Sequence, residues 1–306
     1  MRLLQARISS SRSLLPFMAV CATLVWMGYG LLKDSLWPQF LMFIVTSWIV
    51  VELNNRNSLI RTYSRMVSAS YIMLSLASCF LFPSLGGSLI SLCVVGSLLA
   101  LFHTYQDPNR VGSTYYSFLL LGIGSLADPF ILPLVPIIWI LMASSLSSMG
   151  IRALVASLLG LLTPYWLLAI WCFCSGSLPM LASYLSGLWV LEPLFGWDIP
   201  DLGRLVFLCF IVLLALIGIG HYVITRMDDK IRTRKLYVCL ISLTLAIMVI
   251  MVIQPNHLDT MLRLLTITVS PLIAHFVALT NSKLTNVVFI LLTLAAFSLT
   301  IYNLAS

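Results

Sequence analysis

A single acidic residue, Asp128, stands inside a long apolar run and is the first candidate for chemistry. The run extends from 115 to 146, and Asp128 is followed there by Pro129, Pro133 and Pro136. A carboxylate in apolar surroundings is costly unless it is paired, solvated or protonated, and prolines free backbone carbonyls beside it. Asp128 could therefore bind a cation, relay a proton or act as a base. Alternatively, it caps a second half-helix that begins at Pro129.

Arg263 is the second candidate, because it lies about one turn into another apolar run, 260 to 279. Asp259 precedes it by four residues, a spacing that predicts an ordinary ion pair on one helical face. Alternatively, Arg263 binds a lipid phosphate or pairs with Asp128, since both residues are expected toward the outer leaflet. Asp128 and Arg263 are therefore the candidates for binding a substrate or an ion.

Acidic residues in the predicted loops form the third group. Asp34, Asp198 and Asp201, together with Glu192, fall on the same side of the apolar runs as Asp128. A carboxylate in this place could serve as the general base of a transferase at a membrane surface. The alternative is that these acids are simply solvated. Asp34, Asp198 and Asp201 are the catalytic candidates.

Motifs for metals and nucleotides are missing from the sequence. The four histidines share no metal-ligand spacing, and Cys172-x-Cys174 alone is too little to predict a metal site. The sequence contains no G-x-S-x-G, no G-x-x-x-x-G-K-[ST] and no G-x-G-x-x-G opening a nucleotide-binding unit. We expect no metal, no cofactor and no ATP-driven transport by this chain alone.

The elements that must position these residues are apolar segments. Hydrophobic residues make up 60% of the 306 and charged residues 9%, against roughly 45–50% and 25% in soluble domains. Segments long enough to cross a hydrocarbon core of about 30 Å are 14–32, 36–52, 66–82, 86–103, 153–172, 203–224, 237–253, 260–279 and 286–303. We predict an all-α, polytopic transmembrane helix bundle that forms one membrane domain over 1–306.

The run from 115 to 146 is too long for one straight span, and the distribution of Lys and Arg decides how it is divided. If it crossed once, Arg152 and the basic cluster 226–235 would lie opposite the basic residues that precede it. If it crosses twice, or dips in and returns, all the basic clusters fall on one side, as the positive-inside rule requires. The second choice predicts about 11 crossings, with a broken or short helix pair around Asp128-Pro129. Since irregular backbone at membrane depth needs protein or water around it, we expect this pair to be buried in the bundle.

This arrangement predicts a cytoplasmic N-terminus and a C-terminus outside. The first apolar run has about 19 residues, longer than the core of a signal peptide, so we expect an uncleaved first span. Residues 1–13 should lie on the inner membrane surface, and 173–202 should form the largest outer loop. The pairing of four cysteines in the outward halves of the spans remains open: Cys79, Cys172, Cys174 and Cys209.

The net charge of +7 follows the loops and is not gathered on one face of a soluble domain, so we expect no nucleic-acid partner. The lipid bilayer is the expected partner. A polyprenyl phosphate or another anionic lipid, and other membrane subunits, are further candidates.

Three stretches carry a resemblance to a known family: Leu53 to Pro83 (LNNRNSLIRTYSRMVSASYIMLSLASCFLFP), FLLLGIGSLADPFILPLVPIIWILM and LLGLLTPYWLL. They resemble an uncharacterised family of polytopic bacterial inner-membrane proteins over somewhat under half of the chain. The resemblance implies a bacterial inner (plasma) membrane location and carries no activity. It also implies that Asp128 is a local variation, because members of this family more often have aromatic residues there.

Membrane glycosyltransferases of the polyprenol-phosphate-sugar type also resemble the chain, in span number and in an acidic base after the first span. Asp34 holds roughly that place, although the loop around it is shorter than in those enzymes. Three functions follow as hypotheses. The chain takes part in envelope glycan or lipid-linked sugar metabolism, it is a secondary transporter that uses the helix pair at Asp128, or it is a non-catalytic membrane subunit or scaffold.

Overall fold

A computed structural model describes residues 4–176 and 201–305 of the chain. The chain is all-helical, with 82% helix and no strand among the residues described. The α-helices are α1 (Leu4–Ser9), α2 (Leu14–Tyr29), α3 (Trp37–Asn57), α4 (Met66–Ala77), α5 (Leu85–Phe102), α6 (Val111–Ala127), α7 (Leu134–Ser144), α8 (Ile151–Cys174), α10 (Leu202–Thr225), α11 (Ile231–Ile253), α12 (Leu258–Leu279) and α13 (Lys283–Ala305). Short 3-10 helices are η1 (Cys79–Leu81), η2 (Pro129–Ile131), η3 (Arg226–Asp228) and η4 (Pro255–His257).

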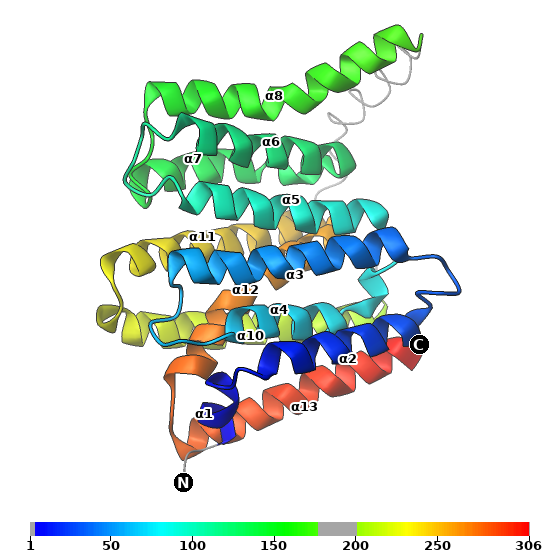
Figure 1. Ribbon diagram of the computed structural model, residues 1–306, viewed down its shortest axis with the longest axis vertical. Helices are drawn as coiled ribbons and strands as arrows, with labels where there is room; N and C mark the ends of the chain where they lie inside the picture. The colour runs from blue at the N-terminus through cyan, green and yellow to red at the C-terminus, as the bar shows by residue number, and fades with distance from the viewer. Residues whose placement is uncertain (1–3, 177–200, 306) are drawn as a thin grey trace.

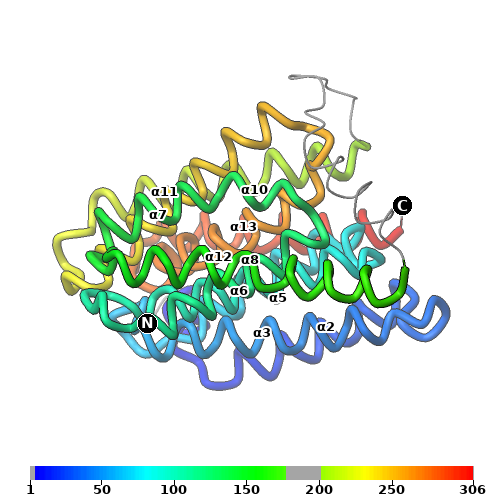
Figure 2. Tube along the Cα trace, turned by 90° about the horizontal axis from the view of Figure 1, so that it is seen from above, coloured from blue at the N-terminus to red at the C-terminus, as the bar shows by residue number. Residues whose placement is uncertain are grey.

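The long helices lie side by side, and the two chain termini lie at opposite ends of the bundle (Figure 1). In the view turned by 90°, α2 and α3 run along one edge, and α10 and α11 along the opposite edge (Figure 2). Among the described helices, six are long and apolar enough to cross a membrane: α5, α8, α10 with η3, α11, α12 with η4, and α13. Shorter apolar helices accompany them: α2, α4, α6 and η2 with α7. Helices of this length and composition are typical of an integral membrane protein.

Helix α12 forms the centre of the bundle. Within the segment Pro255–Leu279, 83% of the residues in its most apolar stretch are buried, against 22–28% for α8, α10 and α13. It packs against α4, α5, α10 and α11, and Figure 1 shows it crossing the stack at a steep angle. A helix buried all round must have its polar side chains satisfied by neighbouring elements.

The connections that carry the basic clusters meet at one end of the bundle, which we call the basic end. Its connections are 58–65, 103–110, 145–150, 226–230 and 280–282. The backbone N–H of Gln106 donates a hydrogen bond to the carbonyl of Leu146, at 2.8 Å. The connections before and after the long apolar run therefore touch, so the run passes twice along the bundle, as the charge distribution predicts.

The helix pair expected around Asp128-Pro129 is present as α6 and η2–α7, both shorter than most of the long helices. The break lies at the end opposite the basic end, and α6 packs between α5 and α8, while Ile140 of α7 is 65% exposed. At the break itself Asp128 and Ile131 are 8% and 0% exposed, so the irregular backbone is covered by protein, and the α11–α12 turn contacts it.

The structure differs from two further expectations, one for the N-terminal segment and one for the loop 173–202. The N-terminal segment packs on the protein, because the Gln5 side chain donates to the carbonyl of Val277 at 2.8 Å and to the hydroxyl of Thr280 at 2.7 Å. The predicted loop 173–202 begins later than expected, since α8 continues to Cys174. Residues 177–200 lie outside the described part of the chain. All seven cysteines are free.

Glycines allow α6 and α8 to approach closely. A Cβ at Gly160 would lie 2.4 Å from the carbonyl oxygen of Tyr115, and a Cβ at Gly122 would lie 2.7 Å from that of Leu161. Backbone atoms cannot move aside as a flexible side chain can. Small residues at these positions are therefore required for the contact, as is usual between membrane helices.

Replacing Gly160 by Ala should lower the stability of the purified protein. The added methyl group forces α6 and α8 apart, at a cost of about 1–3 kcal/mol. Thermal unfolding in detergent measures the effect. The control is Gly220→Ala, because nothing lies within 4 Å of a Cβ at that helical glycine; it should leave stability unchanged or raise it by up to about 1 kcal/mol. Equal effects of the two substitutions would contradict the close contact.

Candidate functional site

The first candidate site surrounds Arg263, in the second turn of α12. Its guanidinium donates to the carbonyl of Leu81, at the end of η1. It also rests against Gly87 of α5, where a Cβ would come within 2.3 Å of Arg263 Nε. A glycine is therefore needed at 87 for the guanidinium to lie there.

Arg263 lacks the acidic partner that the sequence predicts. Asp259 instead binds Arg204 of α10, with an Nε to Oδ1 distance of 2.9 Å and an Nη2 to Oδ2 distance of 3.2 Å. Asp201 binds the same guanidinium from the other side, at 2.5 Å. Among the described residues, no carboxylate lies within ion-pair distance of Arg263. The expected Asp259–Arg263 pair is thus wrong, because a neighbouring helix supplies a bidentate partner.

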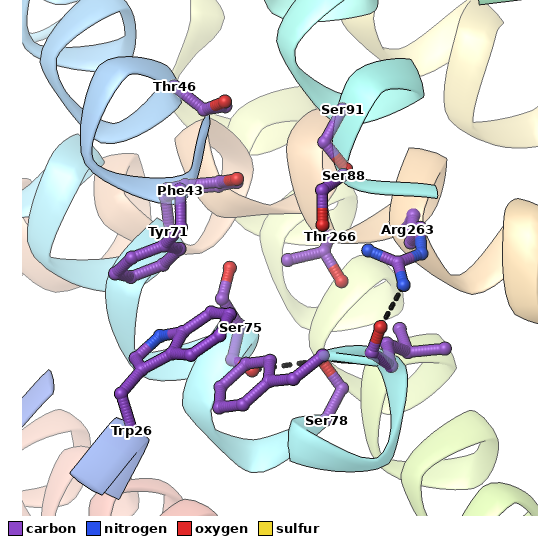
Figure 3. A pocket seen from close by; sticks show the side chains of 12 residues that line it. Trp26, Phe43, Thr46, Tyr71, Ser75, Ser78, Ser88, Ser91, Arg263 and Thr266 are labelled. Carbon is purple, nitrogen blue, oxygen red and sulfur yellow. Dashed lines mark hydrogen bonds between the residues drawn. The ribbon is translucent and has the colours of Figure 1, made fainter. Parts of the chain in front are cut away.

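The side chain of Arg263 borders a pocket of about 450 Å³, a volume that includes its open mouth. Figure 3 shows hydroxyl groups around this pocket, from α3, α4, α5 and α12. They belong to Thr46, Ser75, Ser78, Ser88, Ser91 and Thr266. Most of them donate to a carbonyl one turn earlier on their own helix, as Thr46 does to Met42 at 2.7 Å. Such hydroxyls can turn their hydrogen toward a ligand.

Trp26 contributes a donor without an acceptor among the described residues. Its side chain is 1% exposed and lines the pocket, and its indole Nε1 has no hydrogen-bond partner among the described residues. The ring stacks on Phe82, with centroids 3.9 Å apart. An indole N–H can only donate. With Arg263, Trp26 gives the pocket two side chains that can only donate, the kind of group that binds an anion.

A second hollow meets the first at Arg263. It is lined by Ser84, Gly86 and Gly87 on one side and by Asp128, Asp259 and Thr260 on the other, and Leu81 and Arg263 border both hollows. Asp128 and Arg263 are thus brought to one cavity, as expected, although they form no ion pair.

Asp128 acts as a cap. Its carboxylate accepts from the backbone N–H of Phe130 at 3.1 Å and from the hydroxyl of Thr260 at 2.5 Å, and it lies 3.2 Å from Nδ1 of His257. Burial disfavours the charged form, but these hydrogen bonds outweigh it, so the pKa of Asp128 lies below its ordinary value. The alternative of a cap with Pro129 in the first helical position is confirmed. A role for Asp128 in ion binding stays a prediction.

The loop acids do not converge on a site. Asp34 is exposed, in the turn after Gly30, and Asp201 is engaged by Arg204. Asp198 lies outside the described residues. A catalytic role for these three carboxylates has no common cavity to support it within the described part of the chain.

Sequence reasoning missed a buried acid at the basic end. Asp229 binds His275 of α12, with an Oδ2 to Nε2 distance of 2.9 Å, and the two side chains are 1% and 0% exposed. His275 in turn lies 3.3 Å from His221 of α10, Nδ1 to Nδ1. The histidines were weighed only as metal ligands, and Asp229 stands among basic loop residues. A histidine inside an apolar segment was the signal that could have pointed to this cluster.

Substitution of Asp128 by Ala should destabilise the protein by about 1–3 kcal/mol, because the cap is lost and Thr260 and His257 lose their acceptor. The contribution of the charge should depend on pH. Since the folded pKa is depressed, the stabilisation is fully present above the ordinary value of 3.8 and disappears as the pH falls below it. Thermal unfolding of Asp128→Asn and wild type between pH 3 and 7 measures this. Asp34→Asn, at an exposed acid, is the control; an Asp128 effect that persists unchanged at pH 3 would contradict the ionised cap.

Comparison with family models, curated proteins and solved structures found no match to this chain.

Proposed function

We propose that the chain is a secondary transporter that binds a small anion, carrying a phosphate or carboxylate group, at Arg263. The observation that carries the proposal is the guanidinium of Arg263, which lies in a hydroxyl-lined pocket where no carboxylate of residues 4–176 or 201–305 is in ion-pair distance. This site replaces the expected one, the helix pair at Asp128, as the centre of the transport hypothesis.

The free-energy cost of burying an arginine without a carboxylate partner supports the proposal of a bound anion. Removing a charge from water costs several kcal/mol unless a partner offsets it. Asp259, one turn away on the same helix, would be the natural partner, yet it is held by Arg204. A bound anion would supply the missing charge through parallel N–H to oxygen bonds, for which the guanidinium fork is suited.

The two hollows on either side of Arg263 support a path for such an anion. One is bordered by Asp128 and Asp259 at the end opposite the basic end, and the other extends to Trp26 and Thr46 among the helices. An arginine between two cavities could contact a solute from either one.

The membrane topology belongs to the same proposal. All the described α-helices except α1, taken with their short 3-10 extensions, would cross the membrane once each, which gives 11 crossings for the described part of the chain. The basic end would face the cytoplasm of a bacterial inner membrane, according to the positive-inside rule, and the C-terminus would face the outside. The N-terminus would then be cytoplasmic.

A second function has one observation in its favour. The phosphate of a polyprenyl-linked sugar has the same chemistry as a small anion, and Arg263 is reached from a hollow at the bundle end. Envelope glycan or lipid-linked sugar metabolism therefore stays the alternative, with the chain handling the carrier lipid. A scaffold role with other membrane subunits would not explain why Arg263 lacks a carboxylate partner among the described residues.

Arg263→Gln should lower anion affinity at least about tenfold, because a charge-assisted hydrogen bond contributes about 1.5–3 kcal/mol. Arg263→Lys should bind more weakly than wild type but better than Arg263→Gln. Binding of radiolabelled sulfate, inorganic phosphate and succinate to protein in nanodiscs measures this. Arg152→Gln, at an exposed arginine of the basic end, is the matched control.

A second arm of the experiment, with a polyprenyl phosphate in the nanodiscs, distinguishes a soluble anion from a lipid phosphate as the ligand of Arg263. Binding of the soluble anions that depends on Arg263 supports transport, whereas binding of the polyprenyl phosphate alone would transfer the site to carrier-lipid handling. Wild type that binds none of the four probes would overturn the proposal.

The topology predicts opposite sides for the two termini. A periplasm-dependent alkaline phosphatase fused after Ser306 should be active, and a fusion after Asn109 should be inactive. Green fluorescent protein at the same positions should give the opposite pattern. Equal reporter activity at both positions would contradict an odd number of crossings between Asn109 and Ser306.

A further inference from the structure

The basic end holds a buried chain of three titratable groups that the anion site does not use. Asp229 follows η3, His275 lies in the last turns of α12, and His221 lies in α10. The chain runs from Asp229 Oδ2 to His275 Nε2 at 2.9 Å and from His275 Nδ1 to His221 Nδ1 at 3.3 Å. We propose that Asp229, His275 and His221 form a proton-binding site whose occupancy is coupled to anion binding at Arg263. The coupling rests on the function proposed above, whereas the proton site does not.

The hydrogen-bond pattern fixes where a proton can be stored. A carboxylate only accepts, so His275 carries its hydrogen on Nε2 and its Nδ1 is an acceptor when the ring is neutral. His221 must then donate from Nδ1. If a proton is added to Nε2 of His221, the Nδ1 proton can pass to His275. The product is one imidazolium between Asp229 and His221, with one proton gained and no other bond changed.

A hollow lies next to this chain at its acidic member. Asp229 borders a hollow of about 800 Å³, open space included, together with Arg61, Arg65, Lys230 and Thr233. Its second oxygen, Oδ1, is buried without a hydrogen-bond partner among the described residues. Asp229 therefore separates a basic, water-accessible hollow from two histidines, and the unsatisfied oxygen is a place for water or a proton.

Three elements around His275 contribute titratable or charged groups. From α10 come His221 and Tyr222, whose ring is 5.8 Å from that of His275, and from α11 comes Tyr237, at 4.9 Å. The α3–α4 connection contributes Arg61, which acts on both histidines through space. Arg61 is itself paired with the exposed Asp228, at 3.2 Å.

The outer charges of the cluster lie on η3 and α11. Arg226 and Arg234 act through space on the hydroxyl of Tyr222, and Lys230 borders the hollow beside Asp229. The carboxylate of Asp229 is thus the nearest counter-charge for an imidazolium at 275. The site can hold a proton only while that carboxylate is present.

Both sites lie on α12, which offers a physical route for coupling. Arg263 and His275 are 12 positions apart, or about 18 Å along the helix axis. Pro271 lies between them and cannot donate to the carbonyl of Ile267, so the helix ladder is interrupted. Its own carbonyl accepts from Tyr237, at 3.3 Å, the ring that also contacts His275. A tilt of one half of α12 would therefore disturb both sites.

The sign of the coupling follows from charge. An anion at Arg263 adds a negative charge to the bundle and favours a positive charge at His275. Proton binding must then strengthen anion binding by the same factor. Sulfate is the suitable probe, because it stays divalent over the pH range in which histidine titrates.

The test measures sulfate affinity of the protein in nanodiscs at pH 8 and pH 6. Wild type should bind about tenfold more tightly at pH 6, within the usual range of such couplings, and Asp229→Asn should show less than a twofold change while still binding sulfate. Asp228→Asn is the matched control, since that neighbouring acid is exposed and should keep the wild-type pH dependence. Arg263→Gln should lose sulfate binding at both values of pH. Should Asp229→Asn fail to fold, His221→Gln at a half-buried ring tests the same chain.

The proton site is also measured without any anion. With only four histidines in the chain, nitrogen chemical shifts of labelled protein can follow each ring between pH 5 and 9. His221 and His275 should titrate together, and Asp229→Asn should alter both while His103 and His257 stay unchanged. Independent titration, or an unaltered pair in Asp229→Asn, would overturn the proton site. A wild type that binds no sulfate would overturn the proposed function and the coupling, and the titration would then decide the proton site alone.

Discussion

A helix buried on all sides can keep polar groups only where other elements satisfy them, and the rest of this structure depends on how α12 meets that constraint. Several polar groups of α12 engage other parts of the chain, while Thr266, Thr268 and Ser270 donate to carbonyls within α12 itself. Arg263 binds the carbonyl of Leu81, the carbonyl of Pro271 accepts from Tyr237, and His275 binds Asp229. The carbonyl of Val277 accepts from Gln5 of α1. The central helix is thus held along its whole length by polar contacts to α1, η1, α11 and the α10–α11 turn.

Breaks in the helices next to α12 provide the groups that its polar side chains contact. Helix α4 ends at Ala77 and η1 follows it, so the carbonyl of Leu81 is free of an α-helical partner and is available to Arg263. Phe82, directly after η1, stacks on Trp26 at a 6° interplanar angle and closes the wall of the pocket. The capped turn at Asp128 fixes the start of α12 through Thr260. Irregular backbone is thereby concentrated where α12 needs partners, which is where membrane proteins tolerate it.

The sequence predicted the positions of the helices well, but it predicted poorly which side chains pair between helices. Span length and hydropathy located α2 within 14–32 and α12 at 260–279, and the Lys and Arg distribution correctly divided 115–146 into two helices. These signals are local or depend on the charge of loops. The partner of Asp259 lies 55 positions away in α10, and that of His275 lies in a different turn, so spacing along one helix could not reveal either. Periodicity names residues on one face of a helix, but it cannot say which helix covers that face. Trp26 was overlooked for the same reason, since its role depends on the distance to α4, α5 and α12.

The contact between Gly87 and the guanidinium of Arg263 has a consequence for how this chain can vary. A side chain at 87 would occupy the space of the guanidinium, and a shorter residue at 263 would leave that space empty. The two positions are 176 residues apart, yet neither can change freely while the other stays. Chains descended from a common ancestor with this one should therefore retain glycine and arginine together or replace both. Such a two-position signature would identify members that share the pocket at Arg263 even where the apolar segments have diverged beyond recognition.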